Sequence, residues 1–230
     1  MEYAVYRSAS EINSAMGRVY GHMSIAVIVS MLVSYFVGTN PELLQFFFTG
    51  VMKWVVIFAP LVAIFAISMA MENATKQTAQ LMLYGFSALM GLSFATIFAM
   101  FTMASIVNAF MGAAVLFGVL SVYGYFTKKD LTSIGEFCIV GLIAILVVSI
   151  INIVMAEFWP GVIDNSLLGK VISAISIIIF LGLTAYDTQK IREEVSYVNN
   201  GVAEIRGALT LYMDFINLFI NLLNLFGDRK

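Results

Sequence analysis

Seven long apolar runs alternate with short polar or charged connections along the chain, and this pattern predicts seven membrane-spanning helices. Each run comes close to the roughly 20 residues that a helix needs to cross the bilayer core at about 1.5 Å per residue. Helix-stopping or charged clusters, such as residues 38–41 and 127–133, separate the runs. The predicted spans are residues 22–37, 51–71, 81–101, 105–126, 134–156, 170–190 and 207–226. We therefore expect an all-α integral membrane protein.

The seventh run differs from the others because polar residues recur along one of its faces. Thr210, Asp214, Asn217, Asn221 and Asn224 follow one another at steps of four, three, four and three, which places them on one stripe of a helix. A carboxylate in the middle of an isolated membrane helix costs roughly 3 kcal/mol on insertion scales, and the other polar groups would lack partners in lipid. We therefore expect this helix to lie inside a bundle, with the stripe facing a cavity or other helices.

Composition supports a membrane protein and narrows the chemistry. The chain is 61% hydrophobic and 11% charged, whereas a soluble domain carries about 25% charged residues. A net charge of −2 leaves no basic face for nucleic acid. Cys138 is the only cysteine and His22 the only histidine, which excludes an intramolecular disulfide and argues against zinc or haem. We expect no cofactor, although carboxylates could still hold a hard cation.

Charge also predicts how the chain is oriented. We find no internal repeat and no domain boundary, so residues 1–230 are expected to form a single seven-helix membrane domain that begins with a short arm at residues 1–21. Seven spans place the two termini on opposite sides, and the side with the N-terminus then carries most of the Lys and Arg residues. The positive-inside rule places that side in the cytoplasm and the C-terminus outside. The basic residues on that side are Arg7, Arg18, Lys76, Lys128, Lys129, Lys190, Arg192 and Arg206.

Two aspartates lie within the predicted spans, and they are expected to face each other. Asp187 precedes the cytoplasmic end of the sixth span by a few residues, and Asp214 follows the cytoplasmic start of the seventh. At about 1.5 Å per residue, both lie roughly 7–10 Å below the same surface. Two carboxylates in such a site either share a proton or hold a cation between them. The alternative is that one or both cap a helix or pair with Lys190, Arg192 or Arg206.

The aspartate pair suggests a switch with a polar lining. Protonated, the pair can hydrogen-bond and join its two helices; ionised, it repels itself and attracts a hard cation such as Ca²⁺. The same pair could therefore act as a proton sensor and as a transient calcium site. The residues expected to support it as a polar lining are Thr184, Thr210, Asn217 and Asn221.

Two segments around these aspartates resemble the signature of the Bax inhibitor family, the transmembrane Bax inhibitor motif proteins. They are AYDTQ at residues 185–189 and LYMDFINLFINLL at residues 211–223. The layout of seven spans is also similar over nearly the whole chain. The resemblance implies a seven-helix fold whose last helix is central and surrounded by the other six. It also implies a pH-sensitive Ca²⁺ leak whose sensor is an aspartate pair, matching Asp187 and Asp214.

One feature of the family pattern is missing from this sequence. Family members can carry an arginine toward the cytoplasmic end of the second helix that latches an aspartate in the closed state, but the second predicted span has no arginine. Lys76 and Arg206 are the candidates to substitute as the latch. The lysine-rich tail of some eukaryotic members is also absent, so the chain looks more like a member from a bacterial inner membrane, with its C-terminus in the periplasm.

Three functional hypotheses follow from these residues. The leading one is a Ca²⁺ leak gated by protonation of the pair, with the lipid bilayer, calcium ions and protons as its partners. The second is a membrane-embedded regulator that binds a protein partner, such as a membrane protease or a stress or cell-death component. The third, an intramembrane aspartyl protease, needs a Gly-x-Gly-Asp motif, and Leu211 and Met213 occupy the glycine positions. We therefore expect that the protein is not an enzyme.

Overall fold

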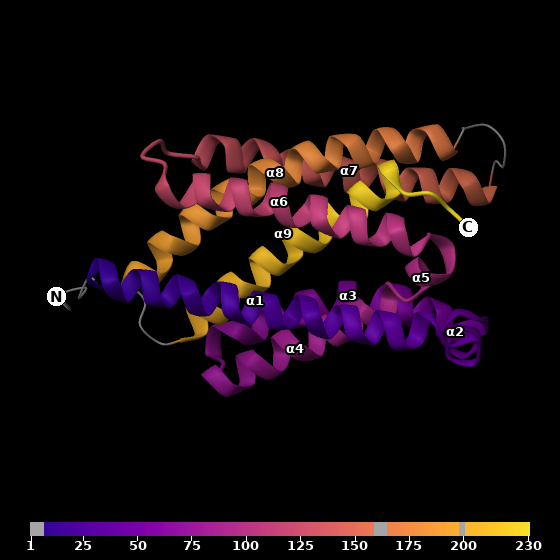
Figure 1. The fold of residues 1–230 in the computed structure, drawn as a ribbon, viewed down its shortest axis with the longest axis horizontal. Coiled ribbons are helices and arrows are strands. Elements are labelled where there is room, and N and C mark those ends of the chain that lie inside the picture. The colour runs from indigo at the N-terminus through magenta and orange to yellow at the C-terminus, as the bar shows by residue number, and fades with distance from the viewer. Residues whose placement is uncertain (1–6, 159–164, 198–200) are drawn as a thin grey trace. The chain divides into compact units, whose positions relative to one another are not determined.

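The computed structural model describes residues 7–158, 165–197 and 201–230, and this part of the chain is almost entirely helical. Its helices, labelled in Figure 1, are α1 Ala9–Gly38, α2 Pro41–Phe48, α3 Gly50–Ala70, the short 3₁₀ helix η1 Met71–Asn73, α4 Lys76–Ser93, α5 Thr96–Met100, α6 Met103–Phe126, α7 Thr132–Phe158, α8 Asn165–Tyr197 and α9 Val202–Phe226. Extended pairing in the described residues is limited to an isolated bridge between Phe101 and Arg229.

Seven stretches of the described chain are long and apolar enough to cross a membrane, as the sequence predicted. They are Ala9–Gly38, Gly50–Asn73, Lys76–Met100, Met103–Phe126, Thr132–Asn152, Leu167–Tyr197 and Val202–Phe226. The last of them is the most buried: half of its most apolar window is covered by protein, against 11% for the windows in Gly50–Asn73 and Thr132–Asn152. The protein is therefore an all-α integral membrane protein whose polar seventh span is the one most covered by other helices.

The chain folds into two compact units, and both α8 and α9 contribute to each of them. The first unit contains residues 1–103, 191–212 and 229–230, and the second contains residues 104–190 and 213–228. The first therefore holds the beginning of α9, whereas the second holds its middle and end. Both predicted aspartates belong to the second unit.

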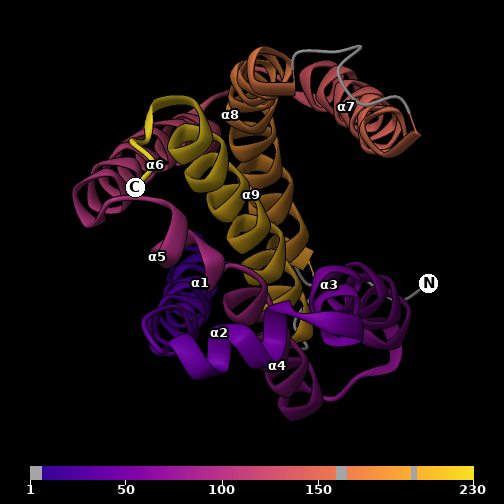
Figure 2. The same ribbon diagram turned by 90° about the vertical axis from the view of Figure 1, so that its right-hand side faces the viewer.

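In the first unit, α4 packs between α1 and α3 (Figure 2). A Cβ atom at Gly91 of α4 would lie 2.5 Å from the backbone oxygen of Ser30 in α1, so only glycine permits this close approach. On the other side of α4, the Ser93 hydroxyl donates to the backbone carbonyl of Val56 in α3 at 2.8 Å. A glycine and a serine that donates to the neighbouring helix thus allow α1, α3 and α4 to pack closely without large side chains between them.

In the second unit, α8 packs between α6 and α7 (Figure 2). A Cβ atom at Gly124 of α6 would collide with the backbone oxygen of Ala185 in α8, and one at Gly182 of α8 would lie 2.5 Å from the sulfur of Cys138 in α7. Further along α8, the side-chain amide of Gln189 donates to the backbone carbonyl of Lys129 at 2.8 Å. The half of α8 that carries Asp187 is therefore held on both sides.

Several helices differ in extent from the sequence prediction. The stretch 191–206, expected to be a charged loop, is mostly helical, because α8 continues to Tyr197 and α9 begins at Val202. Arg and Glu are good helix formers, and a helix does not have to end where it leaves the hydrocarbon. The connection ends at Gly201, whose φ of +70° suits glycine. The predicted third span is also interrupted, at residues 94–95 between α4 and α5.

The predicted N-terminal arm also contains a helix. The first helix starts at Ala9 rather than near His22, and Ser8 caps it in a capping box with Glu11. The Ser8 hydroxyl accepts from the backbone N–H of Glu11, whose carboxylate in turn accepts from the backbone N–H of Ser8 at 2.7 Å. This reciprocal arrangement satisfies two donors at the helix start, so residues 9–21 extend the first span as a continuous helix.

Candidate functional site

The carboxyl groups of Asp187 in α8 and Asp214 in α9 lie within hydrogen-bonding reach of each other. The sequence placed them at matching depth on neighbouring helices, and the second unit brings them together. Two carboxyl groups can hydrogen-bond only if a proton lies between them, because an ionised carboxylate has no donor. Chemically, such a pair can accommodate a shared proton.

Asp214 is the buried member of the pair. Only 4% of its surface is exposed, whereas Asp187 is half-buried. Oxygen Oδ2 of Asp214 has no hydrogen-bond partner among the described residues. A buried carboxylate oxygen without a partner is costly, so this atom marks the place where a proton, water or cation would be stabilised.

Lys190 is the cation that acts electrostatically on Asp187 within the second unit. It lies almost one turn further along α8, and its ammonium group sits 5.5 Å from the ring centroid of Tyr186. The thiol of Cys138 in α7 is also close enough to Asp187 to be affected by its charge. A half-buried carboxylate with one lysine nearby and a fully buried one beside it form an asymmetric pair.

The four residues predicted to line the site share one hydrogen-bonding pattern. Each uses its side-chain donor on the backbone carbonyl four residues earlier in its own helix. The Thr184 hydroxyl donates to Phe180 at 2.7 Å and the Thr210 hydroxyl to Arg206 at 3.2 Å; the Asn217 amide donates to Met213 at 2.8 Å and the Asn221 amide to Asn217 at 2.8 Å. The donors are thus satisfied locally, while the side-chain oxygens keep lone pairs that can accept.

Tyr212, two residues before Asp214, has a packing role in the first unit. It is fully buried, and its hydroxyl lies 2.6 Å from that of Ser30. The Ser30 hydroxyl is also 2.7 Å from the carbonyl of Ser87, to which it donates, so Tyr212 donates to Ser30. The ring of Phe86 meets that of Tyr212 edge to face. These contacts fix the beginning of α9 against α1 and α4.

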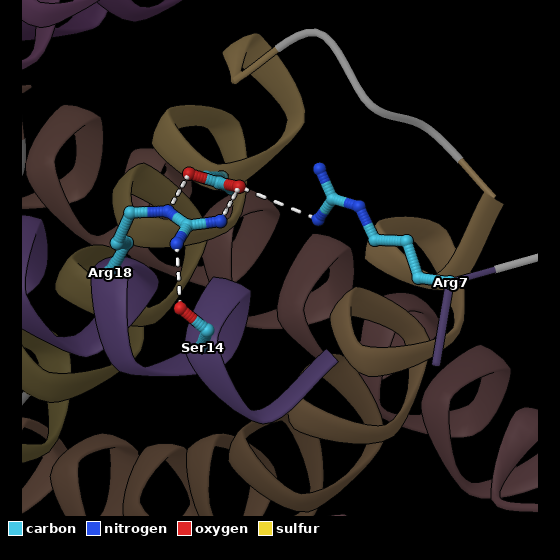
Figure 3. A network of polar contacts seen from close by, with 4 residues as sticks. Arg7, Ser14 and Arg18 are labelled. Carbon is cyan, nitrogen blue, oxygen red and sulfur yellow. Dashed lines mark hydrogen bonds and ion pairs between the residues drawn. The ribbon is translucent and has the colours of Figure 1, made fainter. Parts of the chain in front are cut away.

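A buried ion-pair network at the start of α9 was not anticipated from the sequence. Glu204 is only 2% exposed, and its two carboxylate oxygens accept from Nε and Nη2 of Arg18, both at 2.7 Å. Nη1 of Arg7 lies 3.5 Å from the same carboxylate, and Ser14 accepts from Arg18 at 2.8 Å (Figure 3). The network joins the segment before α1, α1 itself and α9 within the first unit.

The two latch candidates have other neighbours in the first unit. Arg206 pairs with Glu194 at 3.3 Å, and both side chains are partly exposed. The side chain of Lys76 lies against Gly201, where an added Cβ would be 2.9 Å from its Cδ atom. A latching role for either residue stays a prediction.

Comparison with known proteins supports the resemblance seen in the signature segments. The family described as "Inhibitor of apoptosis-promoting Bax1" matches residues 12–230. The inner membrane protein YbhL of Escherichia coli K12 is 32% identical over 234 residues, covering 99% of this chain and 97% of the relative. An uncharacterized protein of Borreliella burgdorferi is 34% identical, with 95% and 93% covered, and the uncharacterized protein YrjE of Lactococcus lactis is 33% identical, with 94% and 91% covered.

Proposed function

Because the chain belongs to the Bax inhibitor family, we propose that this integral membrane protein is a calcium leak gated by protonation of the Asp187–Asp214 pair. The observation that carries the proposal is the buried carboxylate of Asp214, which meets a second carboxyl group and has an oxygen without a partner among the described residues. We propose a bacterial inner membrane as its location, with the N-terminus in the cytoplasm and the pair near the cytoplasmic side.

The chemistry of the pair sets the direction of the pH response. At low pH a proton bridges the two carboxyl groups, which joins α8 to α9 and leaves the pair with one negative charge instead of the two that attract a divalent cation. As the pH rises the bridging proton is lost, and the two carboxylates repel each other and attract a hard cation such as Ca²⁺. Calcium flux should therefore rise with pH.

The test is calcium entry into liposomes that contain the purified protein, measured across about pH 5 to 8. We expect flux to rise at least about tenfold over this range, because one proton must leave the pair and each pH unit changes its occupancy up to tenfold. The Asp187→Asn variant should lose most of this pH dependence, since an amide cannot release the bridging proton. Empty liposomes at each pH provide the baseline.

Absence of flux above that baseline at every pH, with a folded and correctly inserted protein, would overturn the leak. The regulator hypothesis then gains support if Asp187→Asn and the parent capture the same membrane partner equally well. A pH-dependent flux that the variant leaves unchanged would keep the leak and reject the pair as its gate.

A further inference from the structure

The aspartate pair cannot satisfy a calcium ion by itself. Ca²⁺ takes about six to eight oxygen ligands, whereas two carboxylates offer at most about four oxygens. No group of three or more His, Cys, Asp or Glu side chains is placed to hold a metal in the part of the chain that the structure describes. Neutral oxygens near Asp214 are therefore the next ligands to consider.

Asn217 and Asn221 present such oxygens on the same stripe of α9. They follow Asp214 by three and seven residues, spacings that place all three side chains on one face of the helix. Side chains on a helix lean toward its N-terminus, so the Asn217 amide lies toward Asp214 and the Asn221 amide toward Asn217. Both asparagines are half-buried.

The hydrogen bonds fix which end of each amide is turned away from the helix. The nitrogen of Asn217 lies 2.8 Å from the carbonyl oxygen of Met213, and that of Asn221 lies 2.8 Å from the carbonyl oxygen of Asn217. A carbonyl oxygen only accepts, so the atom facing it must be the NH₂ group. The amide oxygens are left out of these bonds, and each carries a partial negative charge suited to a cation.

We propose that Asn217 and Asn221 form, with Asp214, a ladder of oxygen ligands along which a hard divalent cation moves after it leaves the carboxylate pair. The inference rests on the proposed function and adds to it the residues that replace water around the ion. The carboxylates supply the charge and the pH response, and the two amides supply neutral oxygens at successive turns. A weak ligand at each turn lets an ion pass without being trapped.

The test compares leucine and serine at each position in reconstituted liposomes. Leucine is similar in size to asparagine and has no oxygen, whereas serine donates to the carbonyl four residues earlier and still offers lone pairs. We expect Asn217→Leu and Asn221→Leu to lower Ca²⁺ flux about tenfold and to lower it more than K⁺ flux. The serine variants should keep at least about a third of the parent Ca²⁺ flux. The control is Asn108→Leu, an exposed asparagine in α6.

The outcomes separate this inference from the proposed function. Parental flux that survives both leucine variants, with the same ratio of Ca²⁺ to K⁺, overturns the ladder and leaves the aspartate gate intact. Equal loss of both ions in the leucine variants also overturns it, because a packing defect has no reason to discriminate between them. Lack of flux in the parent removes the proposed function instead. If the leucine variants have lower Ca²⁺ flux but the same pH profile as the parent, the result supports separate roles for the carboxylates, which set the pH response, and the amides, which supply ligands.

Discussion

Replacing Asp214 by asparagine is expected to lower calcium flux about tenfold or more at pH 8 and to leave a flat pH profile. The asparagine amide can donate to Asp187 as a protonated Asp214 would, so the variant imitates the closed pair, which holds one proton and one negative charge. A unit charge about 4 Å from a cation attracts it by roughly 4 kcal/mol at an effective dielectric constant of 20. Even if solvent screening halves this attraction, its loss lowers calcium occupancy more than about tenfold. The measurement is calcium entry into liposomes at several pH values.

The matched control for this variant is Asp228→Asn. Asp228 lies just beyond the end of α9, is exposed, and uses its backbone N–H to donate to Ser105 at 2.9 Å, so loss of its charge leaves that hydrogen bond in place. We expect parental flux and an unchanged pH profile from this control. An equal loss of calcium flux in both variants would show that flux depends on the net negative charge of the protein and not on the buried pair.

Replacing Glu204 by glutamine is expected to be the most destabilising of the conservative carboxyl-to-amide substitutions. The change removes the negative charge of Glu204, with which the guanidinium groups of Arg18 and Arg7 both form ion pairs. Breaking a buried ion pair costs about 3–5 kcal/mol, and because Arg18 is 43% exposed screening reduces this to about 2 kcal/mol. For a chain of this size, we expect the Tm in detergent to fall by about 4–8 °C.

Glu194→Gln is the comparison for the Glu204 variant. Glu194 pairs with Arg206 at 3.3 Å, and the two side chains are 24% and 44% exposed, so its loss should cost at most about 1 kcal/mol. A Glu204→Gln variant that unfolds at the same temperature as Glu194→Gln would contradict the reading of Glu204 as a buried anchor. Thermal unfolding followed by circular dichroism in one detergent would decide between the two results.

The seven spans and the aspartate pair could be predicted because both depend on local periodicity. The stripe from Thr210 to Asn224 requires only the helical repeat, and the matching depth of Asp187 and Asp214 requires only the rise per residue and two antiparallel helices that follow each other in the chain. Burial of Asp214 follows from the cost of turning a carboxylate toward lipid. The structure confirms the all-α membrane fold and places the two carboxyl groups together.

The Glu204 network could not be predicted in the same way, because it joins residues far apart in the chain. Arg18 and Glu204 are 186 residues apart, and no periodicity links them. The charged stretch after the sixth predicted span was predicted to be a loop, which gave no reason to expect a buried Glu204. Its helical continuation instead turns Glu204 toward α1. A glutamate in the first turn of a helix, where it complements the helix dipole, was the local signal that could have identified it.

The breaks and close contacts of helices were also beyond the sequence. The interruption at residues 94–95 contains neither glycine nor proline, so no breaker residue marks it. Gly85 and Gly91 have the same local appearance in the sequence, yet an added Cβ at Gly85 would meet nothing within 4 Å while one at Gly91 would meet Ser30. Tertiary packing, which local rules do not contain, distinguishes them.

If the aspartate pair exchanges a proton for a calcium ion, calcium binding must release protons from the protein. Calcium would be added to the purified protein in weakly buffered detergent at several pH values, and the released protons would be counted with an indicator. We expect release of about one proton per chain where the pair is protonated, falling toward zero at higher pH, and none from Asp214→Asn. Calcium binding without proton release, or equal release from the parent and this variant, would contradict the account.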